Sequence, residues 1–141
     1  MYKKIMVPVD LAHLGLLEKP LAVAADMAKH YHAAICYVGV TSSQPSQVAR
    51  TPEEYAQKLR AFAQEQAPGG GDGEQQVETR VYNSPDPIAD LDDTLIKAIK
   101  EIGADLVVMG TRPPKRFNAI IPANGSKVAA RTKASVFLVR P

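Results

Sequence analysis

The stretch that decides the fold is Ala104-Asp-Leu-Val-Val-Met-Gly110, together with the Gly125-Ser126 pair and Ser135-Val-Phe-Leu-Val139 that follow it. Its apolar run ends at Gly110 and is typical of a parallel strand that helices bury on both faces. Gly125-Ser126 opens a helical stretch, and the run from Ser135 predicts a last strand. A glycine at a strand end beside a Gly-Ser at a helix start turns backbone N–H groups toward an anion, which predicts a phosphate site here.

Upstream of this stretch, apolar runs and amphipathic helical stripes alternate along the chain. Strands that alternate with helices imply a parallel α/β sheet joined by right-handed crossovers, in one domain over residues 1–141. The predicted strands are 4–9, 34–40, 77–82, 105–109 and 135–139. The predicted helices run from Pro20 to about Tyr31, from Pro52 to no further than Pro68, from Pro87 to the stop at Gly103, and onward from Gly125.

Three local features refine this picture. Residues 77–82 alternate between polar and apolar side chains, which suits a strand at the edge of a sheet. Pro8 has no N–H and argues against a central strand, but it stands at the carboxyl end of its strand, where a ladder bond can be missing. Asp10 follows at the strand tip, where open α/β sheets bind their ligands, and residues 11–19 are expected to be a connecting loop.

Composition excludes several classes of protein. The formal net charge of +2, from 17 Lys and Arg against 15 Asp and Glu, does not favour nucleic acid as a partner. The single cysteine, Cys36, lies in an apolar run and is expected to be a buried thiol. The N-terminal apolar stretch is broken by Pro8, which excludes a signal peptide, and no apolar window is long enough for a membrane span. We therefore expect a cytoplasmic protein without membrane insertion.

Common catalytic and metal signatures are absent from the sequence. It contains no G-x-G-x-x-G after the first strand, no P-loop and no G-x-S-x-G nucleophile elbow. The three histidines include no i, i+4 pair, so no metal site is expected. A response-regulator receiver has the same alternation of elements, but Asp10 is followed by Leu11, and Asn83-Ser84 stands where the phosphoacceptor aspartate should be. No catalytic residue is predicted, and we expect a protein that is not an enzyme.

Three segments, Val-Pro-Val-Asp10, Val-Val-Met-Gly-Thr-Arg112 and Gly125-Ser126 with the strand after it, together resemble the universal stress protein (UspA) family along essentially the whole chain. The resemblance implies a Rossmann-like, five-stranded parallel sheet in the order 3-2-1-4-5 with helices on both faces. It also implies a site for ATP or AMP, with or without Mg²⁺, between the carboxyl ends of strands 1 and 4.

The resemblance also implies a role for individual residues. Asp10 would contact the adenine side, Val38 would line the base pocket, and Met109 and Gly110 would border the ribose and phosphates. Gly125 and Ser126 would donate hydrogen bonds to phosphate oxygens, while nearby cations would supply positive charge. The nucleotide-binding residues implied in this way are Val9, Asp10, Val38, Met109, Gly110, Arg112, Gly125, Ser126 and Lys127.

The chain departs from the ATP motif of the family, G-2x-G-9x-G-[ST], at two points. Pro113 stands where the middle glycine should be, and it has no N–H to donate to a phosphate. Ala123 stands where the final glycine should be, because Gly125-Ser126 comes two residues later. Two interpretations remain open: a longer loop that still binds nucleotide, or a nucleotide-free interaction module whose Pro-rich loop 113–122 closes the pocket.

The last strand predicts how copies of the chain associate. If it lies at a sheet edge, Val136, Phe137, Leu138 and Val139 leave an apolar edge with little charge to protect it. A two-fold antiparallel contact with a second copy would cover this edge, so we expect a homodimer. The expected function is a regulator that binds adenine nucleotide and acts through its dimer or through a protein partner whose identity the sequence does not give.

Overall fold

A computed structural model describes residues 1–66, 76–111 and 124–140 of the chain. All five strands pair in parallel in a single sheet, in the order β3-β2-β1-β4-β5, which confirms the predicted fold class. The strands are β1 (Lys4–Pro8), β2 (Ala34–Thr41), β3 (Val77–Asn83), β4 (Leu106–Gly110) and β5 (Ser135–Val139).

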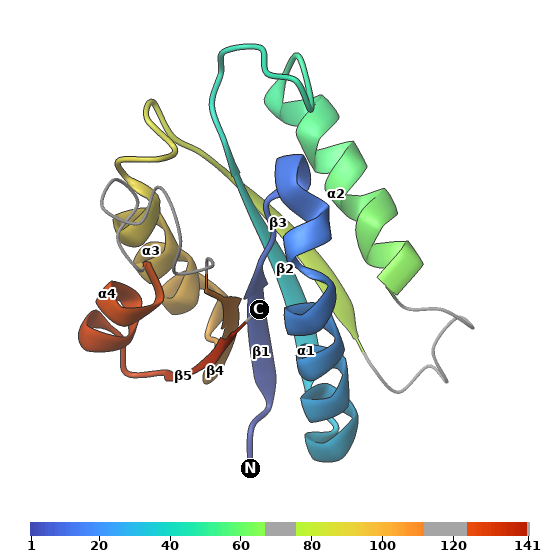
Figure 1. The fold of residues 1–141 in the computed structure, drawn as a ribbon, viewed down its shortest axis with the longest axis vertical. Helices are drawn as coiled ribbons and strands as arrows, with labels where there is room; N and C mark the ends of the chain where they lie inside the picture. Colours follow the sequence, from blue (N-terminus) through green and yellow to red (C-terminus); the bar gives the residue numbers. More distant parts are fainter. Residues whose placement is uncertain (67–75, 112–123, 141) are drawn as a thin grey trace.

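The helices form one layer on each side of this sheet (Figure 1). Helices α1 (Glu18–Tyr31) and α2 (Pro52–Gln66) cover one face, and α3 (Leu91–Ile102) and α4 (Asn124–Arg131) cover the other. A short 3-10 helix, η1 (Leu11–Leu16), connects β1 to α1. Because every crossover helix runs back against its strand, the first turns of the helices lie at the carboxyl edge of the sheet.

Side chains alternate between the two faces of the sheet and so build two cores. Ile5 and Val7 of β1 pack toward α1 and α2, whereas Met6 between them packs toward α3 and α4. All three side chains are fully buried. This arrangement is why the central strands read as unbroken apolar runs, as expected for a sheet covered on both faces.

Several predicted boundaries differ from the structure, most of them at strand ends by one residue, and the larger differences are near α1 and α3. Helix α1 begins at Glu18 rather than at Pro20, because a proline is tolerated anywhere in a first turn, where N–H groups have no helical acceptor. Residues 11–16 of the predicted loop form η1.

Helix α3 begins at Leu91 rather than at Pro87. Residues 86–90 form a separate turn, in which the Asp86 carboxylate accepts a hydrogen bond from the Ala89 N–H at 3.1 Å. The backbone of Asp90, at φ −93° and ψ 6°, departs from helical geometry between this turn and the helix. Ile88, which the predicted helix from Pro87 includes, therefore stays 80% exposed in the structure.

Candidate functional site

Strands β1 and β4 separate at their carboxyl ends. Their register contains only the pairs Ile5–Leu106 and Met6–Val107. Beyond these pairs, β1 continues to Pro8 beside β2, and β4 continues to Gly110 beside β5. This is also the position where the strand order reverses direction, the switch point at which open α/β sheets bind ligands.

Pro8 explains where the pairing stops. Backbone groups of a parallel strand alternate between its two neighbours, and the Lys4 carbonyl accepts from Asp105 beside β4, whereas the Val9 N–H donates to Val38 of β2. By this alternation the missing N–H of Pro8 is one that would face β4. Pro8 therefore cannot donate the backbone hydrogen bond that would have extended the pairing of β1 with β4.

Asp10 lies directly beyond this point and is half-exposed. One carboxylate oxygen accepts a hydrogen bond from the Ala12 N–H at 3.0 Å and so caps η1. The other oxygen lies 2.8 Å from Nδ1 of His13, whose ring is also half-exposed. Asp10 is therefore held in place by its own local turn, with one oxygen shared with an imidazole.

Sequence reasoning missed the contact of His13 with Asp10, because it tested the histidines as metal ligands and not as partners of this aspartate. The signal that could have found it is the i, i+3 spacing from an aspartate at a helix N-cap, where the side chains of the first turn come together.

The two predicted valines belong to the core. Val9 is 4% exposed on the α1/α2 face, and Val38 is 1% exposed on the α3/α4 face. The Val9 N–H donates to the Val38 carbonyl at 2.8 Å. The structure therefore brings them together through their backbones, with their side chains on opposite faces of the sheet.

At the end of β4, Met109 is buried in the α3/α4 core, and Gly110 is exposed. A Cβ added at Gly110 would lie 2.9 Å from Cγ of Pro20 in the first turn of α1. Close packing against this proline is by itself a reason for a glycine at this position. After it, the Thr111 N–H donates to the Val139 carbonyl at 2.9 Å, which keeps β4 joined to β5.

Helix α4 places the Gly-Ser pair in its first turn. Gly125 is buried, and a Cβ added there would overlap Cδ2 of Leu138 on β5. Ser126 and Lys127 are exposed in the same turn. Predicted residue Arg112, the substituted motif positions Pro113 and Ala123, and the whole of loop 113–122 lie outside the described residues.

Two ion pairs connect α4 to α3. Nζ of Lys127 lies 3.8 Å from Oδ2 of Asp92, and Nη1 of Arg131 lies 2.7 Å from Oδ1 of Asp93. Sequence reasoning identified Lys127 but neither aspartate. Their pairing depends on how α3 and α4 pack, which no local spacing reveals.

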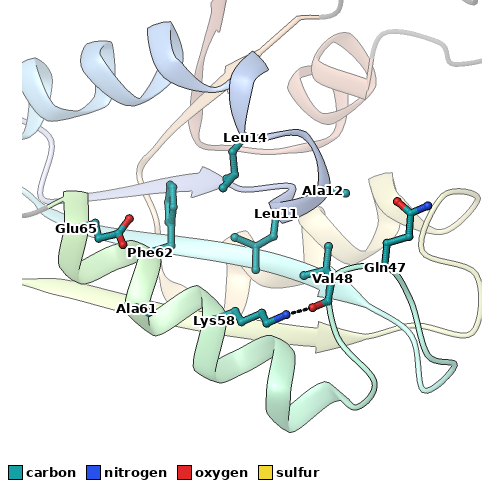
Figure 2. A pocket seen from close by; sticks show the side chains of 9 residues that line it. All are labelled: Leu11, Ala12, Leu14, Gln47, Val48, Lys58, Ala61, Phe62 and Glu65. Atoms are coloured by element: carbon teal, nitrogen blue, oxygen red, sulfur yellow. Dashed lines mark hydrogen bonds between the residues drawn. The ribbon is translucent and has the colours of Figure 1, made fainter.

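A separate hollow of about 490 Å³ lies on the α1/α2 side (Figure 2). It is formed by η1, the β2–α2 connection and α2, and it includes none of the predicted nucleotide residues. At its margin, Nζ of Lys58 donates to the Val48 carbonyl and lies 3.5 Å from a Glu54 carboxylate oxygen. Its lining residues are Leu11, Ala12, Leu14, Gln47, Val48, Lys58, Ala61, Phe62 and Glu65.

Burial raises the pKa of three core groups, one of which, Tyr55, also feels the negative charge of Asp10. Desolvation raises the pKa of the Cys36 thiol to about 11, and the negative charge of Glu78 adds to this effect. Burial also raises the pKa of Tyr37 and of Tyr55. All three shifts favour the neutral side chain, as expected of groups that are packed in a core.

Neither a metal centre nor a membrane span is found in the described part of the chain. Over residues 1–66, 76–111 and 124–140, no three His, Cys, Asp or Glu side chains come together as metal ligands would. Within the same ranges, every helix is too short or too polar to cross a bilayer.

The family model described as the universal stress protein family matches residues 1–140. The chain belongs to this family. Among solved structures, a universal stress protein in complex with cAMP has a TM-score of 0.70 at 19% identity, with 99% of this chain and 97% of that chain covered. A universal stress protein from Archaeoglobus fulgidus has a TM-score of 0.66 at 20% identity, with 98% of each chain covered.

A universal stress protein from Archaeoglobus fulgidus in complex with dAMP matches with a TM-score of 0.61 at 18% identity, over 97% of each chain. At these identities the likeness establishes the universal stress protein fold and not the ligand. No curated protein sequence matches the chain.

Proposed function

We propose that this universal stress protein binds an adenine nucleotide at the carboxyl ends of β1 and β4. The observation that carries the proposal is the separation of these strands after Met6 and Val107, at the switch point of the sheet. Asp10 lies on one side of this point, and Gly110 lies on the other. Two structural relatives support the ligand class, because they are complexes with cAMP and with dAMP.

In this proposal the ligand lies across the switch point with its phosphates toward α4. The half-exposed Asp10 carboxylate accepts from the adenine amino group, and the first turn of α4 offers N–H groups and the Lys127 ammonium to the phosphates. We propose no catalytic role for these residues. Any hydrolysis of ATP is expected to be slow, because the described residues include no cluster of carboxylates for a metal ion.

The proposed regulator acts in the cytoplasm through a homodimer or through a protein partner. The dimer is proposed to form along β5, at the edge of the sheet, where Phe137 is 43% exposed and Leu138 is 37% exposed. Antiparallel pairing of two β5 edges would cover both side chains and satisfy the free backbone groups of each edge.

The direct test is isothermal titration of nucleotide-stripped protein with ATP, AMP and adenosine, with Mg²⁺ and with EDTA. Asp10→Asn keeps an oxygen for the Ala12 N–H, and asparagine caps helices as well as aspartate does. It replaces the other carboxylate oxygen by an NH₂ group, which cannot accept from adenine. We expect about a tenfold loss of affinity for all three ligands, the usual effect of losing a hydrogen bond to a charged group.

Asp26→Asn is the matched control, since Asp26 is exposed on α1 and the same charge is removed away from the proposed site. The control should bind as the wild type does. A folded wild-type protein that gives no heat with any of the three ligands would contradict the proposal, as would equal losses in the two variants.

The second candidate, a nucleotide-free interaction module, is favoured by the contact between Asp10 and His13. At 2.8 Å the imidazole occupies the oxygen that adenine would use. His13→Ala separates the two candidates, because it frees this oxygen and leaves the cap on Ala12 intact. If nucleotide binds, the variant should bind it at least as well as the wild type does. If neither protein binds, the interaction module is the better account.

A further inference from the structure

The ion pair between Lys127 and Asp92 is looser than its neighbour one turn along α4. Its charged atoms lie 3.8 Å apart, beyond hydrogen-bonding distance, whereas Arg131 and Asp93 approach to 2.7 Å. The Lys127 side chain is 51% exposed. An ammonium held by charge alone, on a flexible stem with room to move, can turn toward a better acceptor.

Asp92 is the more confined partner. Its side chain is 18% exposed, and its Oδ1 atom is buried without a hydrogen-bond partner among the residues that the structure describes. Asp93 on the same turn is 71% exposed. The Asp92 carboxylate is therefore poorly solvated and depends on the Lys127 charge, so moving that charge away carries a free-energy penalty.

Both residues lie at the edge of the sheet where the phosphates are proposed to bind. Asp92 is in the first turn of α3, and Lys127 follows Gly125-Ser126 in the first turn of α4. A phosphate at the start of α4 offers charged oxygens that bind an ammonium more strongly than a carboxylate at 3.8 Å does. Phosphate and Asp92 are thus two acceptors for one cation.

We propose that Asp92 competes with bound phosphate for Lys127, and that this competition sets how strongly the protein prefers phosphorylated adenine nucleotides over adenosine. The inference rests on the proposed nucleotide site and adds the residue pair that tunes it. Without phosphate, Lys127 stays near Asp92. When phosphate binds, Lys127 turns to it, and part of the binding free energy is spent on leaving Asp92 unpaired.

The test compares Asp92→Asn and Asp93→Asn by titration with ATP, with adenosine and with inorganic tripolyphosphate, in EDTA and in Mg²⁺. Each variant removes one negative charge from the same turn, but only Asp92 pairs with Lys127. We expect Asp92→Asn to bind ATP and tripolyphosphate about two- to fivefold more tightly, the range set by ion pairs of this kind. Adenosine affinity should not change, and Asp93→Asn should bind all three probes as the wild type does.

Lys127→Gln completes a double-mutant cycle. It should weaken ATP binding about tenfold and leave adenosine binding unchanged. In this background Asp92→Asn should give no gain, because its effect passes through Lys127. Thermal unfolding of each variant shows whether α3 and α4 remain packed.

Several outcomes would overturn the inference. An equal gain in both aspartate variants, or a gain that persists with Lys127→Gln, would mean that general charge repulsion acts instead. If Asp92→Asn binds ATP more weakly than the wild type in Mg²⁺ but not in EDTA, Asp92 acts as a metal ligand instead. ATP bound equally by wild type and Asp92→Asn overturns this inference and leaves the proposed function standing. Tripolyphosphate binding that responds to Asp92→Asn without any adenosine or ATP binding would overturn the proposed function and the nucleotide preference that rests on it, and no binding of any probe would overturn both as well.

Discussion

Replacement of Gly125 by alanine tests whether this glycine serves packing or phosphate binding. The added Cβ would overlap Cδ2 of Leu138, but it would lie 3.4 Å from Cγ and 3.5 Å from Cδ1 of the same side chain. Among the described residues, one terminal methyl group is in the way. Because Leu138 is 37% exposed, a rotation about its χ2 angle can move this methyl group toward solvent.

The expected change in stability is small. A displaced rotamer costs about 0.5 to 1.5 kcal/mol, and alanine recovers up to about 1 kcal/mol over glycine in a helix. The free energy of unfolding should therefore fall by no more than about 1.5 kcal/mol. Backbone N–H groups at the start of α4 are kept, so ATP affinity should also stay within about threefold if the cradle is made by the backbone.

The assay is urea unfolding of Gly125→Ala, of Leu138→Ala and of the double variant, with ATP titrations of each. In the double variant the overlap is gone, so the alanine at position 125 should become neutral or stabilising. A loss above about 2 kcal/mol in Gly125→Ala that Leu138→Ala does not relieve would refute the packing argument. An intact fold with ATP binding abolished would show that a Cβ at this position blocks the phosphates directly.

Three further predictions concern the core and the sheet edge. Gly39→Ala should destabilise the protein by about 1 to 3 kcal/mol in urea unfolding, because its Cβ would lie 2.6 Å from Cε1 of the buried Tyr55 ring; a loss below 0.5 kcal/mol would contradict this. The pKa of the Cys36 thiol is about 9.0 in the unfolded chain and about 11 in the folded protein. The unfolded state therefore loses this proton first as the pH rises. The free energy of unfolding should be constant below pH 9 and fall by up to about 3 kcal/mol toward pH 11. Cys36→Ala should flatten this decline, and an unchanged slope would argue against the thiol as its source. Phe137→Asp should shift the proposed dimer to monomer in sedimentation velocity, whereas a monomeric wild type at high concentration would rule that dimer out.

The elements that sequence reasoning located well are those whose pattern is fixed by burial. Leu95, Ile99 and Ile102 pack on the sheet from α3 and give that helix the clear stripe that the sequence shows. Residues 77–83 form an edge strand with no fully buried side chain, as their alternation predicted. These assignments succeed because one face of each element packs against the rest of the protein and the other is more exposed to water.

The failures arise where a local signal has more than one structural solution. Proline at position 87 and an aspartate before it fit a helix start, but they fit a turn equally well, and the structure contains the turn. The ion pair between Lys127 and Asp92 joins residues 35 positions apart, and it forms because α3 and α4 pack together. No spacing in the sequence predicts such a pair. Most contacts in a binding site are of this long-range kind, since a site is formed by the ends of different helices and strands.

Gly110 and Gly125 are therefore weak evidence for a phosphate site, although they correspond to the first and, two residues late, the last glycine of the family's ATP motif. A Cβ at Gly110 would crowd Pro20, and one at Gly125 would displace a methyl group of Leu138, whether or not a phosphate ever binds. The features that packing does not demand carry more weight. Pro8 removes a ladder bond from the central strand, which weakens the sheet, and Asp10 places a half-exposed carboxylate directly beyond the resulting separation. The cap on η1 explains one oxygen of Asp10. The pairing given up at Pro8 lowers stability, and binding of a ligand at the switch point would explain why it is given up there.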